Sequence, residues 1–251
     1  MPPTTRTGIV MTTDAMDNIG PDLSGARLQR LMTWLSPAFP VGAFSYSHGL
    51  ELAVETGMVA DRDDLWDWVA TIVTVGAGRI DAALFCAAYE AVAASDDDGL
   101  AWALERGDAM RPTRELGLET LSQGTAFVSA VGRHWPGPWL IRLGELAEAD
   151  ARAVAYPVAV GVAAAEHGIP LASALAAYLH AFAANIVSAG VRAIPLGQSD
   201  GLHLLAALEP TVVAAAAAAR ARTVEDLGTA AVMVDWASTL HETQYTRLFR
   251  S

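Results

Sequence analysis

Apolar residues at helical spacing constrain the fold of this chain more than any other feature. Between Pro170 and Ala193 the large apolar residues recur at steps of three and four, as Leu171, Leu175, Leu179, Phe182 and Ile186. That spacing places them on one face of an α-helix. Proline is well suited to the first turn of a helix. We therefore predict a helix over this segment with one buried face.

Further helices are predicted on both sides of it. Asp61 is expected to cap a helix with acidic residues in its first turn, where the helix dipole favours carboxylates. A second apolar stripe runs through residues 116–131. Ser199 is expected to act as the N-cap of a later helix, and Thr223 with Asp226 to start another.

Proline and glycine divide the pattern into segments connected by short loops. Breaks fall at Gly57, 96–99, 136–138, 168–170 and 195–197. Alternating apolar and polar runs joined by hairpin turns, which are typical of strands, are absent. The chain is therefore predicted to be all-α, a single multi-helix bundle domain over residues 25–251. Residues 1–24 lack apolar periodicity and the apolar core of a secretory signal, and they predict a disordered leader.

Composition narrows the classes of partner. The formal net charge of -12 argues against a nucleic-acid backbone or an anionic membrane as the main partner. The single cysteine, Cys86, excludes an intramolecular disulfide and is expected to be a buried free thiol in the reducing cytoplasm. The longest apolar runs, 153–165 and 212–219, are shorter than the roughly 20 residues that cross a bilayer, so no membrane span is expected. Hydrophobic residues make up 53% of the chain and charged residues 18%, which predicts exposed apolar patches for partner contacts.

One string imitates a serine hydrolase. Residues 197–201 fit the G-x-S-x-G pattern around Ser199. That motif works at a strained turn between a strand and a helix, which exposes the serine hydroxyl. Here the preceding segment is predicted to be helical, and no strands are predicted. A helix connection is therefore favoured, and a serine hydrolase using Ser199 is kept as an alternative.

Two other strings imitate metal-dependent enzymes. Asp63, Asp64 and Asp67 spell the D-D-x-x-D pattern of prenyl-chain enzymes that hold Mg²⁺ and diphosphate. The only other acidic cluster, 96–98, is interpreted as a polar loop rather than as the facing ligand set. His241 and Glu242 begin like a zinc motif, but tyrosine stands where the second histidine is needed. For the three aspartates, compensation of the helix dipole in a first turn is favoured, and a Mg²⁺-dependent prenyl-type enzyme is kept as an alternative.

A stiff apolar loop follows the first predicted helix. Residues 36–51 read Ser-Pro-Ala-Phe-Pro-Val-Gly-Ala-Phe-Ser-Tyr-Ser-His-Gly-Leu-Glu. Its prolines restrict the backbone and its glycines permit turns. Its aromatic residues either pack on the bundle or form a contact surface. The candidate partner-binding residues of this loop are Pro37, Pro40, Gly42, Phe44, Ser45, Tyr46 and Glu51.

The C-terminal segment is unusually rich in interface residues. Chain ends usually drift toward polar composition. Residues 241–251 instead combine aromatic and arginine side chains, which dominate binding energy at protein interfaces. The segment is expected to dock either on a partner or back on its own bundle. Its candidate partner-binding residues are Tyr245, Arg247, Leu248, Phe249 and Arg250.

The loop 36–51 and the tail 241–251 together resemble the urease accessory protein F (UreF) family. Matching strings lie between them in the same order, around Arg114–Gly124, Tyr156–Gly161 and Asn185–Gly201. The resemblance extends from about Leu28 to Ser251. Phe39 and His48 stand where typical members have leucine and glutamine, a departure that bears on details of partner choice.

The resemblance implies an all-α homodimer that is not an enzyme. It implies binding to the urease accessory scaffold protein D, called H in some bacteria, and through it to the accessory GTPase G and apo-urease. The complex, rather than a tightly bound cofactor of this chain, is expected to handle nickel, since clustered histidine or cysteine ligands are missing. Arg192, Gln198 and Asp200 are candidates for a polar patch at the dimer or GTPase face. A helical adaptor of another complex is the remaining alternative.

Overall fold

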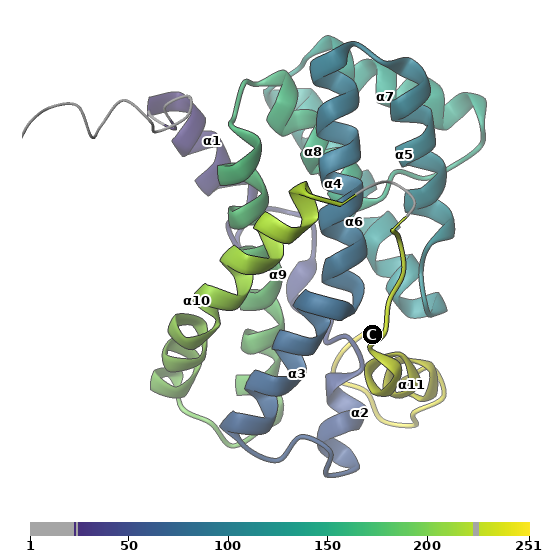
Figure 1. Cartoon of the computed structure of the whole chain (residues 1–251). Coiled ribbons are helices and arrows are strands. Elements are labelled where there is room, and N and C mark those ends of the chain that lie inside the picture. The colour runs from purple at the N-terminus through teal and green to yellow at the C-terminus, as the bar shows by residue number, and fades with distance from the viewer. Residues whose placement is uncertain (1–22, 24, 223–225) are drawn as a thin grey trace, which may run out of the picture.

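The computed structural model describes Leu23, residues 25–222 and residues 226–251. Over these residues the chain is a single all-α domain without a strand, as predicted (Figure 1). The leader predicted for residues 1–24 lies outside the described residues except at Leu23. The first helix begins directly after it, at Gly25. Thr223, the predicted start of the last helix, also lies outside them. That helix begins instead at Val232, so the placement of its start near Thr223 and Asp226 was wrong.

The helices are connected by short loops. In chain order they are α1 (Gly25–Trp34), the 3₁₀ turn η2 (Ala43–Ser45), α2 (Leu50–Glu55), α3 (Arg62–Val75), α4 (Ala77–Ala94), α5 (Asp97–Ala109), α6 (Arg114–His134), α7 (Pro138–Ala149), α8 (Tyr156–Glu166), α9 (Leu171–Ala193), α10 (Gln198–Arg220) and α11 (Val232–His241). Helices α3 and α4 follow one another with only Gly76 between them.

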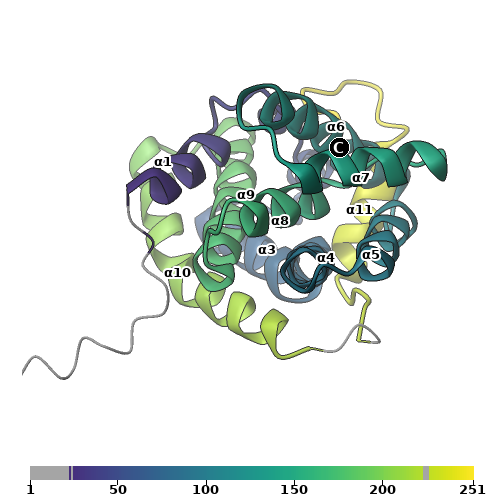
Figure 2. The same cartoon turned by 90° about the horizontal axis from the view of Figure 1, so that it is seen from above.

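Helix α8 is the centre of the bundle. It packs against α4, α6, α7 and α9, and seen from above it lies within the ring of surrounding helices (Figure 2). Residues Pro157–Ala164 are all buried, because this helix is covered on every side. A Cβ atom on Gly161 would lie 2.6 Å from the Phe85 carbonyl oxygen, so glycine permits the close approach of α8 to α4.

The strongest sequence predictions of helices are confirmed. The Asp61 carboxylate accepts hydrogen bonds from the backbone N–H groups of Asp63 at 2.9 Å and Asp64 at 3.0 Å. This side chain is therefore the N-cap of α3. Helix α9 starts one residue after Pro170, and Leu175, Leu179 and Ile186 of its apolar face are buried. The local signals were sufficient here because cap and periodicity agree.

Two helix starts differ from the prediction. Helix α10 begins at Gln198 with Gly197 as its N-cap, so Ser199 lies inside the first turn and is not the cap. The reason is that the Asp200 carboxylate accepts the Gly197 N–H at 2.9 Å, which moves the start forward. The acidic cluster 96–98 is not a loop. Asp96 caps α5 by accepting the Gly99 N–H at 3.0 Å, and the two aspartates after it form the first turn.

The apolar helices are longer than the apolar runs suggested. Three helical segments, 62–94, 171–193 and 198–220, are long and apolar enough to cross a membrane by length and composition alone. The prediction that no stretch reaches this length was therefore wrong, because single polar residues do not interrupt a helix. The most apolar windows of the first two segments are 67% and 50% buried within the bundle, whereas that of α10 is only 28% buried. Helix α10 thus keeps an unusually apolar exposed surface.

Candidate partner-binding site

The loop 36–51 is a turn-rich connection between α1 and α2. Gly42 and Gly49 have positive φ angles of 76° and 72°, which glycine adopts without strain. A Cβ atom on Gly49 would lie 2.7 Å from the Ser238 backbone nitrogen, so this turn also needs glycine for space. His48, with φ at 55°, enters the same turn. The loop therefore has one well-defined course across the bundle.

The tail 242–251 docks back on the bundle and runs beside this loop. The Arg250 N–H donates to the Ser45 carbonyl at 2.8 Å, and the Ser47 N–H donates to the Ser251 carbonyl at 2.9 Å. The segment is not helical, so the spacing of Tyr245, Leu248 and Phe249 does not gather them on one face. Phe249 is buried, whereas Tyr245 is fully exposed and Leu248 is 66% exposed.

Glu51 fixes the tail from the first turn of α2. Its two carboxylate oxygens accept the backbone N–H groups of Leu248 at 2.6 Å and Phe249 at 2.8 Å. One of these oxygens also lies 3.3 Å from Nε2 of His241. A carboxylate that accepts several N–H groups forms stronger hydrogen bonds than a neutral acceptor. Glu51 is therefore the residue that joins the loop, the tail and α11.

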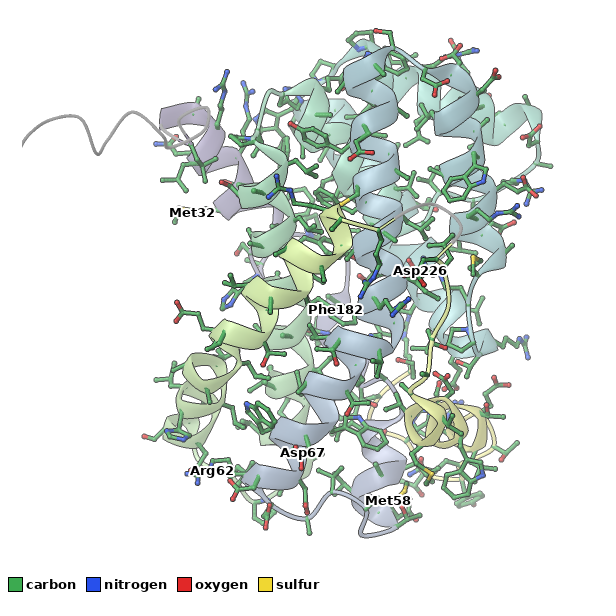
Figure 3. All side chains as sticks on the ribbon, in the orientation of Figure 1. Met32, Met58, Arg62, Asp67, Phe182 and Asp226 are labelled. Atoms are coloured by element: carbon green, nitrogen blue, oxygen red, sulfur yellow. The ribbon has the colours of Figure 1, made fainter. Side chains whose placement is uncertain are left out.

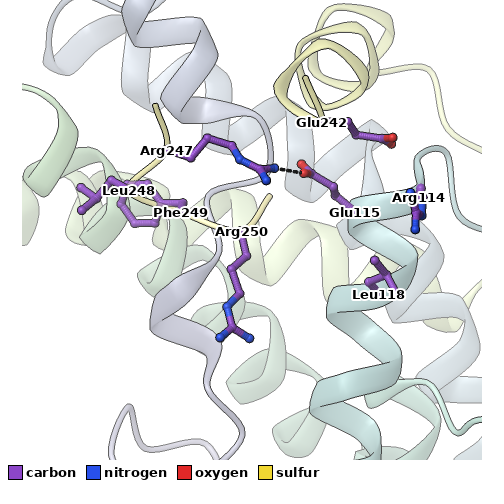
Figure 4. A pocket seen from close by; sticks show the side chains of 8 residues that line it. All are labelled: Arg114, Glu115, Leu118, Glu242, Arg247, Leu248, Phe249 and Arg250. Atoms are coloured by element: carbon purple, nitrogen blue, oxygen red, sulfur yellow. Dashed lines mark hydrogen bonds and ion pairs between the residues drawn. The ribbon is translucent and has the colours of Figure 1, made fainter. Parts of the chain in front are cut away.

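Glu115 on α6 continues this network. Its carboxylate accepts from the Arg247 guanidinium at 2.6 Å, as Figure 4 shows. It also lies 2.7 Å from Nδ1 of His241. His241 is completely buried with a carboxylate at each ring nitrogen. The cluster thus holds two carboxylates opposite an imidazole and a guanidinium.

Glu119, one helical turn later, binds the end of the tail. Its carboxylate accepts the Ser251 hydroxyl at 2.9 Å and the Gln123 amide at 3.0 Å, and lies 3.1 Å from Nε2 of His48. Burial of the His48 ring disfavours its charged form. The charge and hydrogen bond of Glu119, with a further contribution from Asp81, outweigh this and place the pKa of His48 above its usual value.

Helix α9 supports the exposed tip of the loop. The Asn185 amide donates to the Ala43 carbonyl at 2.7 Å, and the Arg192 guanidinium donates to the Phe44 carbonyl at 2.8 Å. The same guanidinium lies 4.6 Å from the centre of the Phe249 ring. Arg192 therefore connects loop and tail, and the Phe44 side chain is left 64% exposed.

The predicted polar patch is not one cluster. Asp200 caps its own helix and lies 4.0 Å from Arg62, and among the described residues neither it nor Gln198 bonds to Arg192. The predicted loop residues are also divided between core and surface. Tyr46 is buried, Ser45 and Glu51 are half-buried, and Pro37, Pro40, Gly42 and Phe44 are exposed.

An open groove of about 510 Å³ lies between the tail and the start of α6 (Figure 4). Two of its arginines, Arg114 and Arg250, form no ion pair or hydrogen bond through their side chains with the residues that the structure describes. Leu118 is 54% exposed beside them. The groove thus offers unpaired guanidinium groups next to apolar surface, which suits an acidic partner segment with an apolar neighbour. Its lining residues are Arg114, Glu115, Leu118, Glu242, Arg247, Leu248, Phe249 and Arg250.

Sequence reasoning missed the carboxylates that hold this site together. Glu115, Glu119 and Gln123 are buried at intervals of four residues on α6. The available signal was a polar residue at every fourth position, because that spacing places all three on one face of the helix. The two glutamates bond to residues more than a hundred positions away in the chain, at His241, Arg247 and Ser251, whereas Gln123 bonds to Glu119 on the same helix.

Comparison with known proteins shows the family of the chain. The model of the UreF family matches residues 59–209. The urease accessory protein UreF of Rhodopseudomonas palustris strain BisB5 is 53% identical over 226 residues, covering 90% of this chain and 92% of that protein. The protein of the same name from Bradyrhizobium diazoefficiens is 48% identical over 246 residues, covering 97% of this chain and all of that protein. The chain belongs to the UreF family.

As a UreF protein the chain is an accessory protein and not a catalyst, and its enzyme-like strings have other roles in the structure. Ser199 is exposed in the first turn of α10, and no described histidine is bonded to it. Asp64 accepts the Ala60 N–H at 2.9 Å, beside the N-cap formed by Asp61. His241 is bound by Glu51 and Glu115 as part of the tail site. No three histidine, cysteine, aspartate or glutamate side chains of the described residues are grouped to hold a metal ion.

Proposed function

We propose that this chain supports urease maturation by binding the accessory scaffold protein D or H through the tail–loop site. The observation that carries the proposal is the division of the tail into buried and exposed residues. Phe249 and Ser251 are buried and bonded to the bundle, while Tyr245 and Leu248 project from it. Exposed aromatic and aliphatic side chains on a fixed backbone can bind without a large cost in conformational entropy.

The scaffold-binding surface includes the groove beside the tail. Arg114 and Arg250 provide charge for an acidic side chain of the scaffold, and Leu118 provides apolar contact. The exposed Phe44 at the loop tip extends the same surface, since Arg192 bonds the Phe44 carbonyl and stacks on Phe249 of the tail. Residues from the loop, the tail, α6 and α9 thus contribute to one contact.

Bridging to the GTPase G and coupling of its nucleotide state to nickel delivery are further parts of this proposal. The support is the family membership and the surface of the bundle that remains free when the tail–loop site is occupied. We propose that nickel is carried by the assembled complex in the cytoplasm, with no tightly bound cofactor in this chain. Urease from cells that lack this chain is then expected to contain little nickel and to regain it on complementation.

A homodimer is proposed from the exposed face of α10. Leu202 is 69% exposed and Val213 is 57% exposed on a helix whose most apolar window is only 28% buried. Apolar faces of this size are commonly covered by a second subunit. Light scattering after size exclusion is expected to give twice the chain mass for the wild type. The Leu202→Asp and Val213→Asp double variant is expected to give the mass of one chain.

The scaffold contact is tested by removing exposed tail side chains only. A Tyr245→Ala and Leu248→Ala double variant is expected to weaken scaffold binding about tenfold or more, because interface aromatic anchors contribute on this scale. A Thr246→Ala variant, an exposed position between them, is the matched control. Far-ultraviolet circular dichroism is expected to be unchanged in both. Undiminished co-purification of the double variant with the scaffold would contradict the tail assignment.

A further inference from the structure

A second surface with different chemistry lies along α11. Its exposed side carries Val232, Met233, Trp236 and Leu240, which are 72%, 55%, 46% and 41% exposed. The opposite side is buried against the bundle through Val234, Ala237, Ser238 and His241. Apolar residues on both sides of a short surface helix exceed what contact with the bundle requires. The outer side is therefore a surface that a partner can cover.

A hollow of about 420 Å³ lies beside this surface, between α3 and the start of α11. Met58 and Asp67, which line it, lie at the same end of the molecule (Figure 3). Its apolar wall extends into the exposed side of α11 through Val232 and Met233. The remaining lining residues are Val59, Asp64, Trp68, Thr71, Ala230, Ala231 and Val234.

The charge of this hollow is negative. Asp64 and Asp67 are its only charged lining residues, and neither forms an ion pair among the described residues. Asp64 uses one oxygen to accept the Ala60 N–H, and its other oxygen is left for a donor from outside. Asp67 is exposed and has no hydrogen-bond partner in the described part of the chain. A positively charged group is therefore attracted to the hollow.

The hollow is also lined by an aromatic side chain. Trp68, on α3, contributes to its wall and is 8% exposed. The surface thus combines apolar and aromatic contact with two carboxylates.

We propose that this hollow and the outer side of α11 bind an amphipathic segment of another protein that carries arginine or lysine next to large aliphatic residues. The aliphatic side chains would cover Met233 and Trp236, and the basic group would lie against Asp64 and Asp67. The tail of this chain does not occupy the hollow, because its described residues are bonded to Glu51, Glu115 and Glu119. Residues 1–22 contain one arginine and three aspartates, which is the wrong charge balance.

This surface is independent of the scaffold site. The tail groove presents unpaired arginines, whereas the α3–α11 hollow presents unpaired aspartates. An acidic segment therefore fits the tail groove and a basic segment fits the α3–α11 hollow. Each segment is repelled from the other surface, because it meets side chains of its own charge there. A chain with two such surfaces can hold two partners at once.

The test uses two fluorescein-labelled helical peptides of 18 residues and the full chain at about 0.15 M salt, where distant charges are screened. One peptide has leucines spaced by four residues with arginines beside them. The other has glutamates in place of the arginines. Fluorescence anisotropy is expected to show that the arginine peptide binds and that the glutamate peptide binds at least about tenfold more weakly. Equal binding of the two peptides, or binding of neither, overturns the proposal.

Variants of the chain locate the binding surface. Asp67→Arg and Met233→Asp are each expected to weaken binding of the arginine peptide about fivefold or more. Glu148→Arg, the same charge reversal at an exposed position on α7, is expected to change it by less than about twofold. Equal weakening by Glu148→Arg identifies non-specific attraction to the negative chain and overturns the proposal.

Two further measurements keep the test decisive. Circular dichroism and the melting temperature verify folding, and Asp67→Asn with Met233→Gln replaces any variant that does not fold. Deletion of residues 1–22 is expected to leave peptide affinity unchanged. A fivefold gain on that deletion would show that the chain's own N-terminal residues occupy the hollow, which overturns the assignment to another protein.

Discussion

Glu51 accepts the backbone N–H of Phe249 at 2.8 Å, across 198 positions of the chain. The same carboxylate accepts the Leu248 N–H and contacts His241. Because backbone N–H groups are bound, rather than side chains, the tail is held by its main chain and its outer side chains stay free. This contact makes the tail both an ordered element and a binding surface.

Replacing Glu51 by alanine is expected to release the tail. The change leaves two backbone donors and one ring nitrogen of the buried His241 without their acceptor, and it should lower the free energy of unfolding by about 2–4 kcal/mol. Glu55→Ala, one helical turn later, is the matched control. Glu55 is exposed and bonds only the Gln244 side chain, so a loss below about 1 kcal/mol is expected. Urea unfolding gives the free energies, and hydrogen exchange at residues 245–251 reports tail release. Slow exchange in Glu51→Ala would contradict the contact's role.

Replacing Gly49 by alanine is expected to be much more damaging than replacing Gly42. Both residues have positive φ, which costs an alanine about 1–2 kcal/mol. A Cβ atom on Gly42 meets open space, whereas one on Gly49 lies 2.7 Å from the Ser238 backbone nitrogen. The free energy of unfolding of the Gly49 variant should therefore be lower by about 3 kcal/mol or more in total, because α11 must move to make room for the Cβ atom. Thermal unfolding of the two variants checks this difference, and equal melting temperatures would show that α11 adapts.

Signals from neighbouring residues predicted where the helices lie, but not which side chains bond to which at their ends. The cap at Asp61 and the apolar spacing in α9 are properties of neighbouring residues, and both are confirmed by the structure. The start of α10 was misplaced because serine at 199 and the aspartate at 200 are both acceptable capping residues. Only the three-dimensional structure shows that Asp200 bonds backward to Gly197.

The loop 36–51 and the tail 241–251 were predicted as two separate contact surfaces, whereas the structure places them side by side. The loop and tail were recognised by their unusual composition, and the resemblance to UreF added their function. Their junction could not be predicted, because it depends on bonds from Glu115 and Glu119 to residues of the tail that are more than a hundred positions away in the chain. Burial of polar groups is decided by contacts between distant segments, and no spacing rule within one segment reports them.

Cys86 is expected to react very slowly with thiol reagents in the folded chain. It is 6% exposed, and burial raises its pKa to about 12. The thiolate is the reactive form, so little of it is present at pH 8. Reaction with Ellman's reagent should be about 100-fold or more slower in buffer than in urea, where the one thiol per chain reacts fully. A rapid reaction in buffer would show that α4 opens readily around this residue.

His48 is expected to make stability fall as the pH rises. Its folded pKa is raised above the ordinary value of 6.5, so the folded chain binds the proton more tightly than the unfolded chain. The resulting stabilisation is fully present below pH 6.5 and is lost as the pH rises through the folded pKa. A His48→Gln variant keeps a donor for Glu119 but does not titrate. The difference in unfolding free energy between wild type and variant, measured in urea from pH 6 to 9, should therefore shift steadily in favour of the variant. A difference that stays constant over that range would mean that Glu119 does not hold a proton on His48.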